Sequence, residues 1–188
     1  YKTVKIGNQE WMAENLKTTK YNDGTSITFV DDKDATGVTW QNLTTEAYSQ
    51  GGTGSSADDN YEDTYGFLYN WWAVDDSRNL APEGWHVPTD DEIKILERSL
   101  GMSIAQSNIG SGLFRGTNEG SKLAGNEGLW TDGNLDTNSE FGSSGFNALP
   151  GGTRDHANSG FQNLGTRFRI WSSTDTGESI GSDETSYA

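Results

Sequence analysis

The chain has 188 residues, a net charge of −15 and no cysteine. The missing cysteine excludes a disulfide framework, thiol catalysis and Cys-ligated zinc. The acidic charge argues against nucleic-acid partners and anionic membranes, and no apolar run approaches the roughly 20 residues needed for membrane insertion. We therefore expect one domain, 1–188, in which 24 glycines form long loops and Trp, Tyr and Phe, seven of each, carry the core.

The first part of the chain favours β structure. Residues 1–30 contain alternating apolar positions, a Gly7-Asn8 turn and a β-branched run over 25–30. Residues 31–64 are predicted to be a loop-rich insertion, with a short helix around 42–48. The dense apolar block 67–74 predicts a short buried helix, although periodicity alone does not separate it from a strand.

The strongest local pattern predicts a helix over residues 90–100. Thr89 and Glu92 have the spacing of a capping box, in which each side chain bonds the other residue's backbone amide. Ile93 and Leu96 begin an apolar face that continues to Leu100. Gly101 is suited to end the helix in a left-handed conformation.

The remainder is predicted to be mostly loops and strands. Residues 103–145 are rich in Gly, Asn and Ser, and 145–173 suggest strands around the turn at 150–152. Residues 174–188 are polar and predict no closing strand. The expected fold class is α+β, with a small twisted antiparallel sheet, one or two short helices and extensive Gly-rich loops.

Six segments of the chain, in this order, resemble the Fibrobacter succinogenes major paralogous domain family. They are Lys5–Leu16, Tyr21–Gly24, Tyr65–Trp71, Leu80–Asp90, Gly145–Gly152 and Ile170–Thr174. The resemblance implies a C-type lectin-like fold, related to the branch of formylglycine-generating enzymes. It also implies a secreted or surface-attached protein of Bacteroidetes or Fibrobacteres. By the family's standard the chain lacks further C-terminal strands.

Catalytic patterns are sparse. His86, beside the predicted helix start, is better explained as a structural hydrogen-bonder than as a general base, and His156 stands next to an aspartate without a nucleophile motif. The chemistry of formylglycine-generating enzymes uses cysteine, which this chain lacks. A pair of carboxylates assembled by the fold keeps a polysaccharide-directed hydrolase open as an alternative.

A calcium site is the expected cofactor site. Asp132, Asn134 and Asp136 place oxygen ligands at alternating positions of a Gly-containing loop, which suits a hard divalent ion. An ordinary Asn/Asp turn explains the same residues, and it is the simpler interpretation.

Aromatic residues provide the candidate ligand site. Trp40 and Trp130 lie in polar, Gly-rich surroundings and are expected to be exposed for stacking on sugars, with Arg154, Asp155 and Asn158 as polar partners. The tryptophans within the family segments are expected in the core; they are Trp11, Trp71, Trp85 and Trp171.

The preferred hypothesis is a noncatalytic extracellular or cell-surface binding or adhesion module that recognises a glycan or a surface protein. An alternative is a structural subunit of a surface filament, which would self-assemble through an unpaired strand edge.

Overall fold

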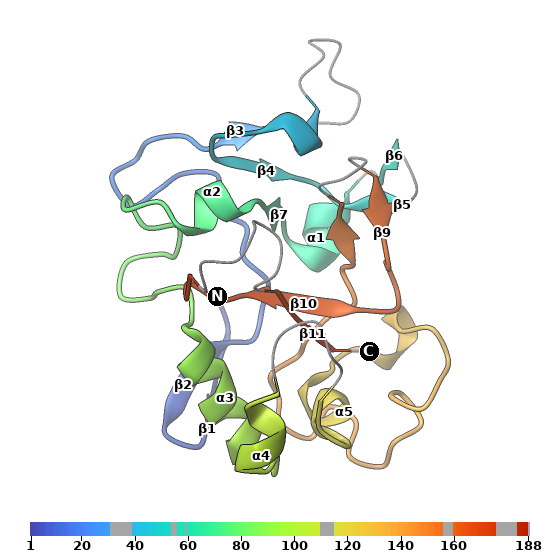
Figure 1. The fold of residues 1–188 in the computed structure, drawn as a ribbon. Coiled ribbons are helices and arrows are strands. Elements are labelled where there is room, and N and C mark those ends of the chain that lie inside the picture. The colour runs from blue at the N-terminus through green and yellow to red at the C-terminus, as the bar shows by residue number, and fades with distance from the viewer. Residues whose placement is uncertain are drawn as a thin grey trace.

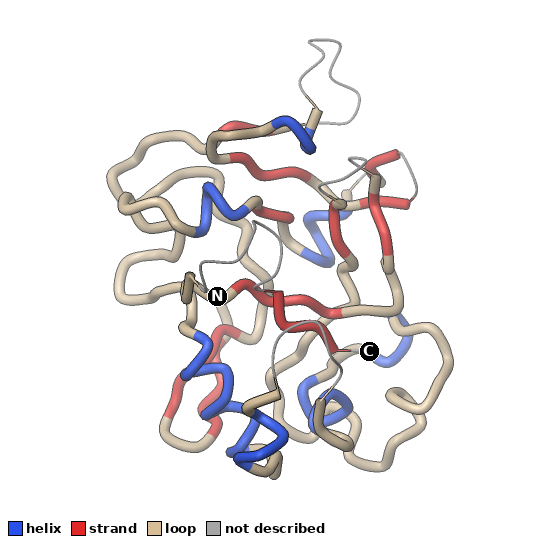
Figure 2. The backbone as a smooth tube through the Cα atoms, in the orientation of Figure 1, coloured by secondary structure: helices blue, strands red, loops and turns tan. Residues whose placement is uncertain are grey.

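The computed structural model describes residues 1–30, 39–53, 56–58, 60–109, 115–155, 160–175 and 184–187. Short strands and helices are separated by long loops throughout these ranges (Figure 2). The fold is mixed α and β with small sheets and few helices, which confirms the predicted class at this level.

The strands are two to four residues long. They are β1 (Thr3–Ile6), β2 (Gln9–Met12), β3 (Thr28–Phe29), β4 (Ala47–Ser49), β5 (Gly52–Thr53), β6 (Ser56–Ala57), β7 (Leu68–Tyr69), β8 (Thr153–Arg154), β9 (Phe161–Gln162), β10 (Phe168–Trp171) and β11 (Glu184–Tyr187). They form the antiparallel pairs β1-β2, β5-β6, β8-β9 and β10-β11 and the sheet β3-β4-β7. Strands β3 and β4 are parallel. The predicted antiparallel pairing is present in every sheet, but the described strands form five small sheets instead of one, and one of these sheets contains a parallel pair.

The helices are α1 (Tyr61–Tyr65), α2 (Trp71–Val74), α3 (Asp90–Ser99), α4 (Ile104–Ser107) and α5 (Glu119–Leu123), with 3-10 turns at Trp40–Asn42 and Glu127–Leu129. Helix α3 has both hydrogen bonds of the predicted capping box between Thr89 and Glu92. Its apolar face is buried at Ile93 and Leu96, and Gly101 follows it with φ +116°. The prediction for this helix is confirmed. No helix in the described ranges is long and apolar enough to cross a membrane.

Three segments differ from the sequence prediction. The expected helix at 42–48 is wrong, because Ala47–Ser49 is β4, the middle strand of its sheet inside the expected loop-rich insertion 31–64. The block 67–74 is divided between β7 and α2. Glu184–Tyr187 pairs with β10 where no closing strand was predicted. In each case a strand forms because a partner distant in the sequence supplies the hydrogen bonds, which local patterns do not reveal.

Two large hydrophobic clusters form most of the core. The elements around them lie in the lower and the upper half of the view in Figure 1. The lower core cluster lies around α3, α5 and the β1-β2 hairpin, and its buried members are Ile6, Trp11, Ile93, Leu96, Leu123, Ala124, Trp130, Phe146, Ala148 and Phe168. The upper core cluster lies around β7 and α2, and its buried members are Tyr21, Ile27, Tyr69, Ala73, Val74 and Leu80. Strand β10 contributes residues to both, because Phe168 joins the lower cluster and Trp171 packs against the upper one.

Candidate functional site

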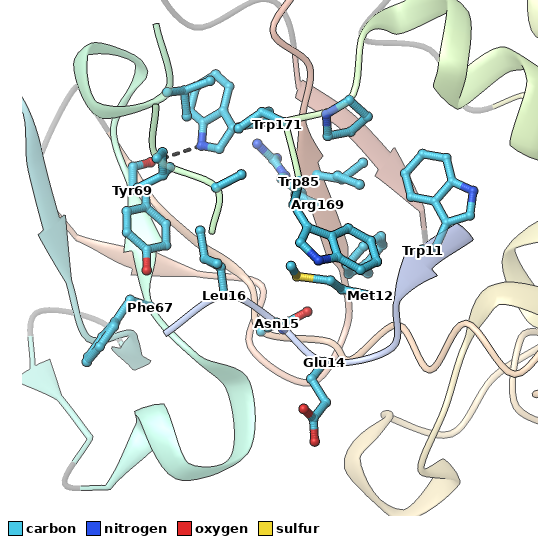
Figure 3. A pocket seen from close by; sticks show the side chains of 18 of the residues that line it. Trp11, Met12, Glu14, Asn15, Leu16, Phe67, Tyr69, Trp85, Arg169 and Trp171 are labelled. Carbon is cyan, nitrogen blue, oxygen red and sulfur yellow. Dashed lines mark hydrogen bonds between the residues drawn. The ribbon is translucent and has the colours of Figure 1, made fainter. Parts of the chain in front are cut away.

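A cavity of about 510 Å³ lies between the two core clusters. Its walls come mainly from five stretches that are far apart in the sequence: 9–16, 61–69, 80–92, 146–152 and 168–171. Figure 3 shows many of the side chains that surround it. A concave space with mostly apolar walls and a few polar groups is the usual form of a small-molecule site.

Aromatic rings make up much of the wall. All three tryptophans of the wall line the cavity. Trp11 is buried, whereas Trp85 and Trp171 are only half-buried. The Trp171 Nε1 donates a hydrogen bond to the Tyr69 carbonyl oxygen at 2.9 Å (Figure 3). This bond holds the indole of β10 against β7, and the ring packs 5.9 Å from that of Trp71.

The segment after β10 is fastened to the start of α3. The Ser173 amide donates to the Pro88 carbonyl oxygen at 2.8 Å, and the Asp90 amide donates to Thr174 Oγ1 at 3.0 Å. The Ser173 hydroxyl donates to the Val87 carbonyl oxygen at 3.1 Å. Two segments more than eighty residues apart thus fix one corner of the cavity.

The strand β7 is fastened to the segment after β2. The Phe67 amide donates to the Leu16 carbonyl oxygen at 3.0 Å, and Asn15 Nδ2 donates to the Tyr65 carbonyl oxygen at 2.8 Å. Gly66 lies between these contacts with φ +73°, and a Cβ there would come 2.6 Å from the Leu16 oxygen. Glycine is therefore required for this close approach.

The 145–152 segment closes the remaining side. Asn147, at φ +62°, donates from Nδ2 to the Ala13 carbonyl oxygen at 3.1 Å. The Tyr61 hydroxyl donates to the Gly151 carbonyl oxygen at 2.6 Å. Burial, with the nearby Tyr65 and Asp58, raises the pKa of Tyr61, and burial likewise raises that of Tyr69. Both phenols therefore remain neutral hydrogen-bond donors at physiological pH.

Polar groups lie on the cavity wall beside α3. Glu92 accepts hydrogen bonds from the Thr89 amide at 2.8 Å and from His86 Nε2 at 2.9 Å. Burial acts to raise the pKa of Glu92, but these hydrogen bonds outweigh it and the pKa falls below its ordinary value. His86 is exposed, and its bond to Glu92 confirms the predicted hydrogen-bonding role. Glu92 is thus held as a carboxylate.

The predicted sugar platform at Trp40 and Trp130 is wrong in its central assumption. Trp40 is 7% exposed and Trp130 is 8% exposed, so neither ring face is open for stacking. Trp40 packs with Val30 and Ala47, while Trp130 joins the lower core cluster and donates from Nε1 to the Gly125 carbonyl oxygen. Polar sequence neighbours did not reveal that these rings are the apolar anchors of otherwise polar loops.

The predicted polar partners have structural contacts. The Arg154 guanidinium lies 4.7 Å from the Trp40 ring centre and donates to the Val30 carbonyl oxygen at 2.6 Å. Asp155 accepts from Gln162 Nε2 at 2.7 Å. Asn158 and His156 lie outside the described residues. The structure thus brings Arg154 to Trp40, and none of the described residues of this predicted site lines the cavity.

The predicted calcium loop is on the surface. Asp132 and Asn134 are exposed, and Asp136 accepts a hydrogen bond from the Gly133 amide at 2.7 Å. Within the described ranges, no three His, Cys, Asp or Glu side chains form a group able to hold a metal ion. Calcium binding by Asp132, Asn134 and Asp136 stays a prediction.

The cavity residues that sequence reasoning missed were available in the sequence. Trp85 and Trp171 were expected in the core because they lie in the matching segments, yet both are half-buried on the cavity wall with Met12 and Leu16. Five of the six matching segments supply cavity walls. The clustering of aromatic residues in those segments was the usable signal.

Comparison with known proteins gives one match. No curated protein and no solved structure matches the chain. The family model described as the Fibrobacter succinogenes major domain matches residues 4–187. This match covers all the segments that surround the cavity, and the chain therefore belongs to the Fibrobacter succinogenes major domain family.

Proposed function

We propose that this domain is a noncatalytic binding module and that the cavity between its two core clusters binds a neutral sugar. One observation carries the proposal: Trp85, Trp171, Phe67 and Tyr69 surround a concave space of about 510 Å³ that also contains polar groups. Flat aromatic faces stack against the C–H face of a sugar ring, while its hydroxyls need polar partners.

The polar lining favours a sugar over a purely apolar ligand. Glu10, Glu14 and Glu92 belong to the wall, together with His86. An apolar ligand would remove these groups from water without offering hydrogen bonds, which is unfavourable. Sugar hydroxyls donate to carboxylates and thus compensate for the lost water.

The charge of the chain favours a neutral ligand. At −15 the protein repels anionic partners at long range. Sulfated or uronate-rich glycans would meet this repulsion as well as the carboxylates of the wall. We therefore assign neutral glycans as the ligand class.

We propose a module without catalytic activity because the pKa of the wall carboxylate with the most hydrogen bonds is shifted in the wrong direction for an acid catalyst. A glycosidase needs one carboxylic acid whose pKa is raised. The pKa of Glu92 is instead lowered, and its oxygens are occupied by Thr89 and His86. We further propose, from the family resemblance, a C-type lectin-like fold and a place at the cell surface.

The test is a titration with neutral disaccharides in which tryptophan fluorescence reports binding. Trp85→Ala should abolish the binding signal, whereas Trp72→Ala should not, because Trp72 is 37% exposed and does not line the cavity. Thermal melting of both variants verifies folding. The absence of binding across a panel of gluco-, manno- and xylo-disaccharides would refute the proposal.

A further inference from the structure

An aromatic face on the β3-β4-β7 sheet continues outward from the cavity. Phe29 is paired with Tyr48 in the parallel register of β3 and β4, and Tyr48 is opposite Tyr69 in the antiparallel register of β4 and β7. Residues directly opposite each other in neighbouring strands project from the same face. Phe67, two residues before Tyr69, packs directly on Tyr48.

The rings form a contiguous row. The Phe29 and Tyr48 centroids are 5.2 Å apart, and those of Tyr48 and Phe67 are 4.8 Å apart. Phe67 and Tyr69 line the cavity, whereas Phe29 at the other end is 44% exposed. We call Phe29, Tyr48 and Phe67 the aromatic row.

The position of Tyr48 on β4 is unusual for an aromatic ring. On β4 the residues on either side of Tyr48 are fully buried, with Ala47 at 0% and Ser49 at 1% exposed. The alternate position of a half-covered strand is usually polar. Here it carries Tyr48, which like Phe67 is partly buried against the upper core cluster, so the row leads from two partly covered rings to the exposed ring of Phe29.

We propose that the ligand is a chain of neutral sugars, one unit of which sits in the cavity while later units run along the aromatic row toward Phe29. This inference rests on the proposed function, because the row adjoins the cavity at Phe67. The charge argument applies equally along the row. The domain would thus bind within a polysaccharide rather than a free monosaccharide.

The tilt between the rings favours a single polysaccharide chain over a flat crystalline surface. Phe29 and Tyr48 are inclined by 51°, and Tyr48 and Phe67 by 63°. A flat crystalline surface contacts only rings that are coplanar. A stepped row follows a single, twisted chain, so the ligand is a soluble or amorphous glycan.

The experiment compares chain lengths. Gluco-, manno- and xylo-oligosaccharides of two and of six units are titrated calorimetrically, and microcrystalline cellulose is used in a pull-down. The hexasaccharide should bind about tenfold more tightly than the disaccharide, because added ring contacts contribute in that range. Phe29→Ala should remove that gain and leave disaccharide binding unchanged. Tyr48→Phe keeps the ring and should retain the gain.

The control is Ile104→Ala, which truncates another exposed apolar side chain, 67% exposed, on α4 away from the row. If both chain lengths bind with equal affinity, or if Phe29→Ala keeps the tighter binding of the hexasaccharide, sugars do not bind along the aromatic row. The cavity proposal would remain intact. Binding to microcrystalline cellulose that Phe29→Ala abolishes would overturn the single-chain assignment. No binding of any oligosaccharide would overturn both proposals.

Discussion

The two core clusters close to different degrees, although both contain aliphatic and aromatic side chains. The lower core cluster is centred on aliphatic residues that are almost completely buried: Ile93 at 0%, Leu123 at 1% and Leu96 at 2% exposed. The upper core cluster relies on Tyr and Trp rings, of which Trp71 and Trp171 stay half-buried. Aliphatic side chains interdigitate to high density, whereas the hydroxyl of a buried Tyr and the Nε1 of a buried Trp also need hydrogen-bond partners.

These polar groups position the upper rings. The Tyr69 hydroxyl donates to the Thr18 carbonyl oxygen at 2.7 Å, and the Trp171 Nε1 donates to Tyr69. Rings held in place by such bonds cannot slide together to fill space. The difference explains why the cavity is found where the rings of the upper cluster meet the closed lower cluster. Substitutions in the closed lower half and in the open upper half should therefore differ in their effects.

The largest expected effect is at a buried ion pair beneath α3. Arg115 Nε donates to Glu97 Oε1 at 2.9 Å, with the two side chains 8% and 0% exposed. Glu97→Ala leaves the buried guanidinium without its carboxylate and should lower the free energy of unfolding by about 3–5 kcal/mol. Urea denaturation measures the loss.

The matched control removes both charges. Glu97→Ala combined with Arg115→Met should recover a large part of the lost stability, because no unpaired charge remains buried. If the free energy of unfolding of Glu97→Ala lies within about 1 kcal/mol of the wild-type value, water reaches this side of the core and the pair is not closed off from solvent.

The second prediction compares one leucine from each half. Leu96→Ala should cost about 2–5 kcal/mol, because it creates a cavity in a closed cluster. Leu16→Ala should cost clearly less, because Leu16 is half-buried and already faces open space. Chemical denaturation of both variants measures the two losses, and equal losses would remove the distinction between the halves.

Sequence reasoning succeeded where the determinants are local. The capping box at Thr89 and Glu92, the apolar face of α3 and the Gly101 end are all encoded within thirteen residues, and all are present. The class of fold was also accessible from the loop-rich composition. These features need no knowledge of distant partners.

The candidate site could not be predicted in the same way. The cavity needs Trp85 and Trp171, more than eighty residues apart, to line the same space, and no local pattern shows that they do. Trp40 looked exposed because its neighbours are polar, yet the distant Arg154 covers its ring. Burial of an isolated aromatic residue depends on such long-range contacts, which is where the prediction of exposed tryptophans failed.

The third prediction concerns the start of α3. Thr89→Ala removes the side-chain oxygen that accepts from the Glu92 amide and should cost on the order of 1 kcal/mol. Thr89→Ser keeps the oxygen and should lie close to the wild type. An unchanged melting temperature in Thr89→Ala would show that the cap is dispensable, because tertiary contacts such as that between Asp90 and Thr174 already hold this helix end.

The smallest expected effect separates the charge of Glu92 from its geometry. Burial opposes ionisation, but the bonds from Thr89 and His86 keep the pKa of Glu92 below its ordinary 4.5. A lowered pKa in the folded state adds stability above pH 4.5, and this contribution disappears as the pH falls through the folded-state value. At neutral pH Glu92→Gln should therefore be less stable than the wild type by under about 1 kcal/mol, since the group is partly exposed. That difference should shrink when unfolding is measured at successively lower pH. A difference that stays constant from pH 7 to pH 3 would mean that the shape of the capping box matters and its charge does not, so that the open side of the molecule gains nothing electrostatic from this carboxylate.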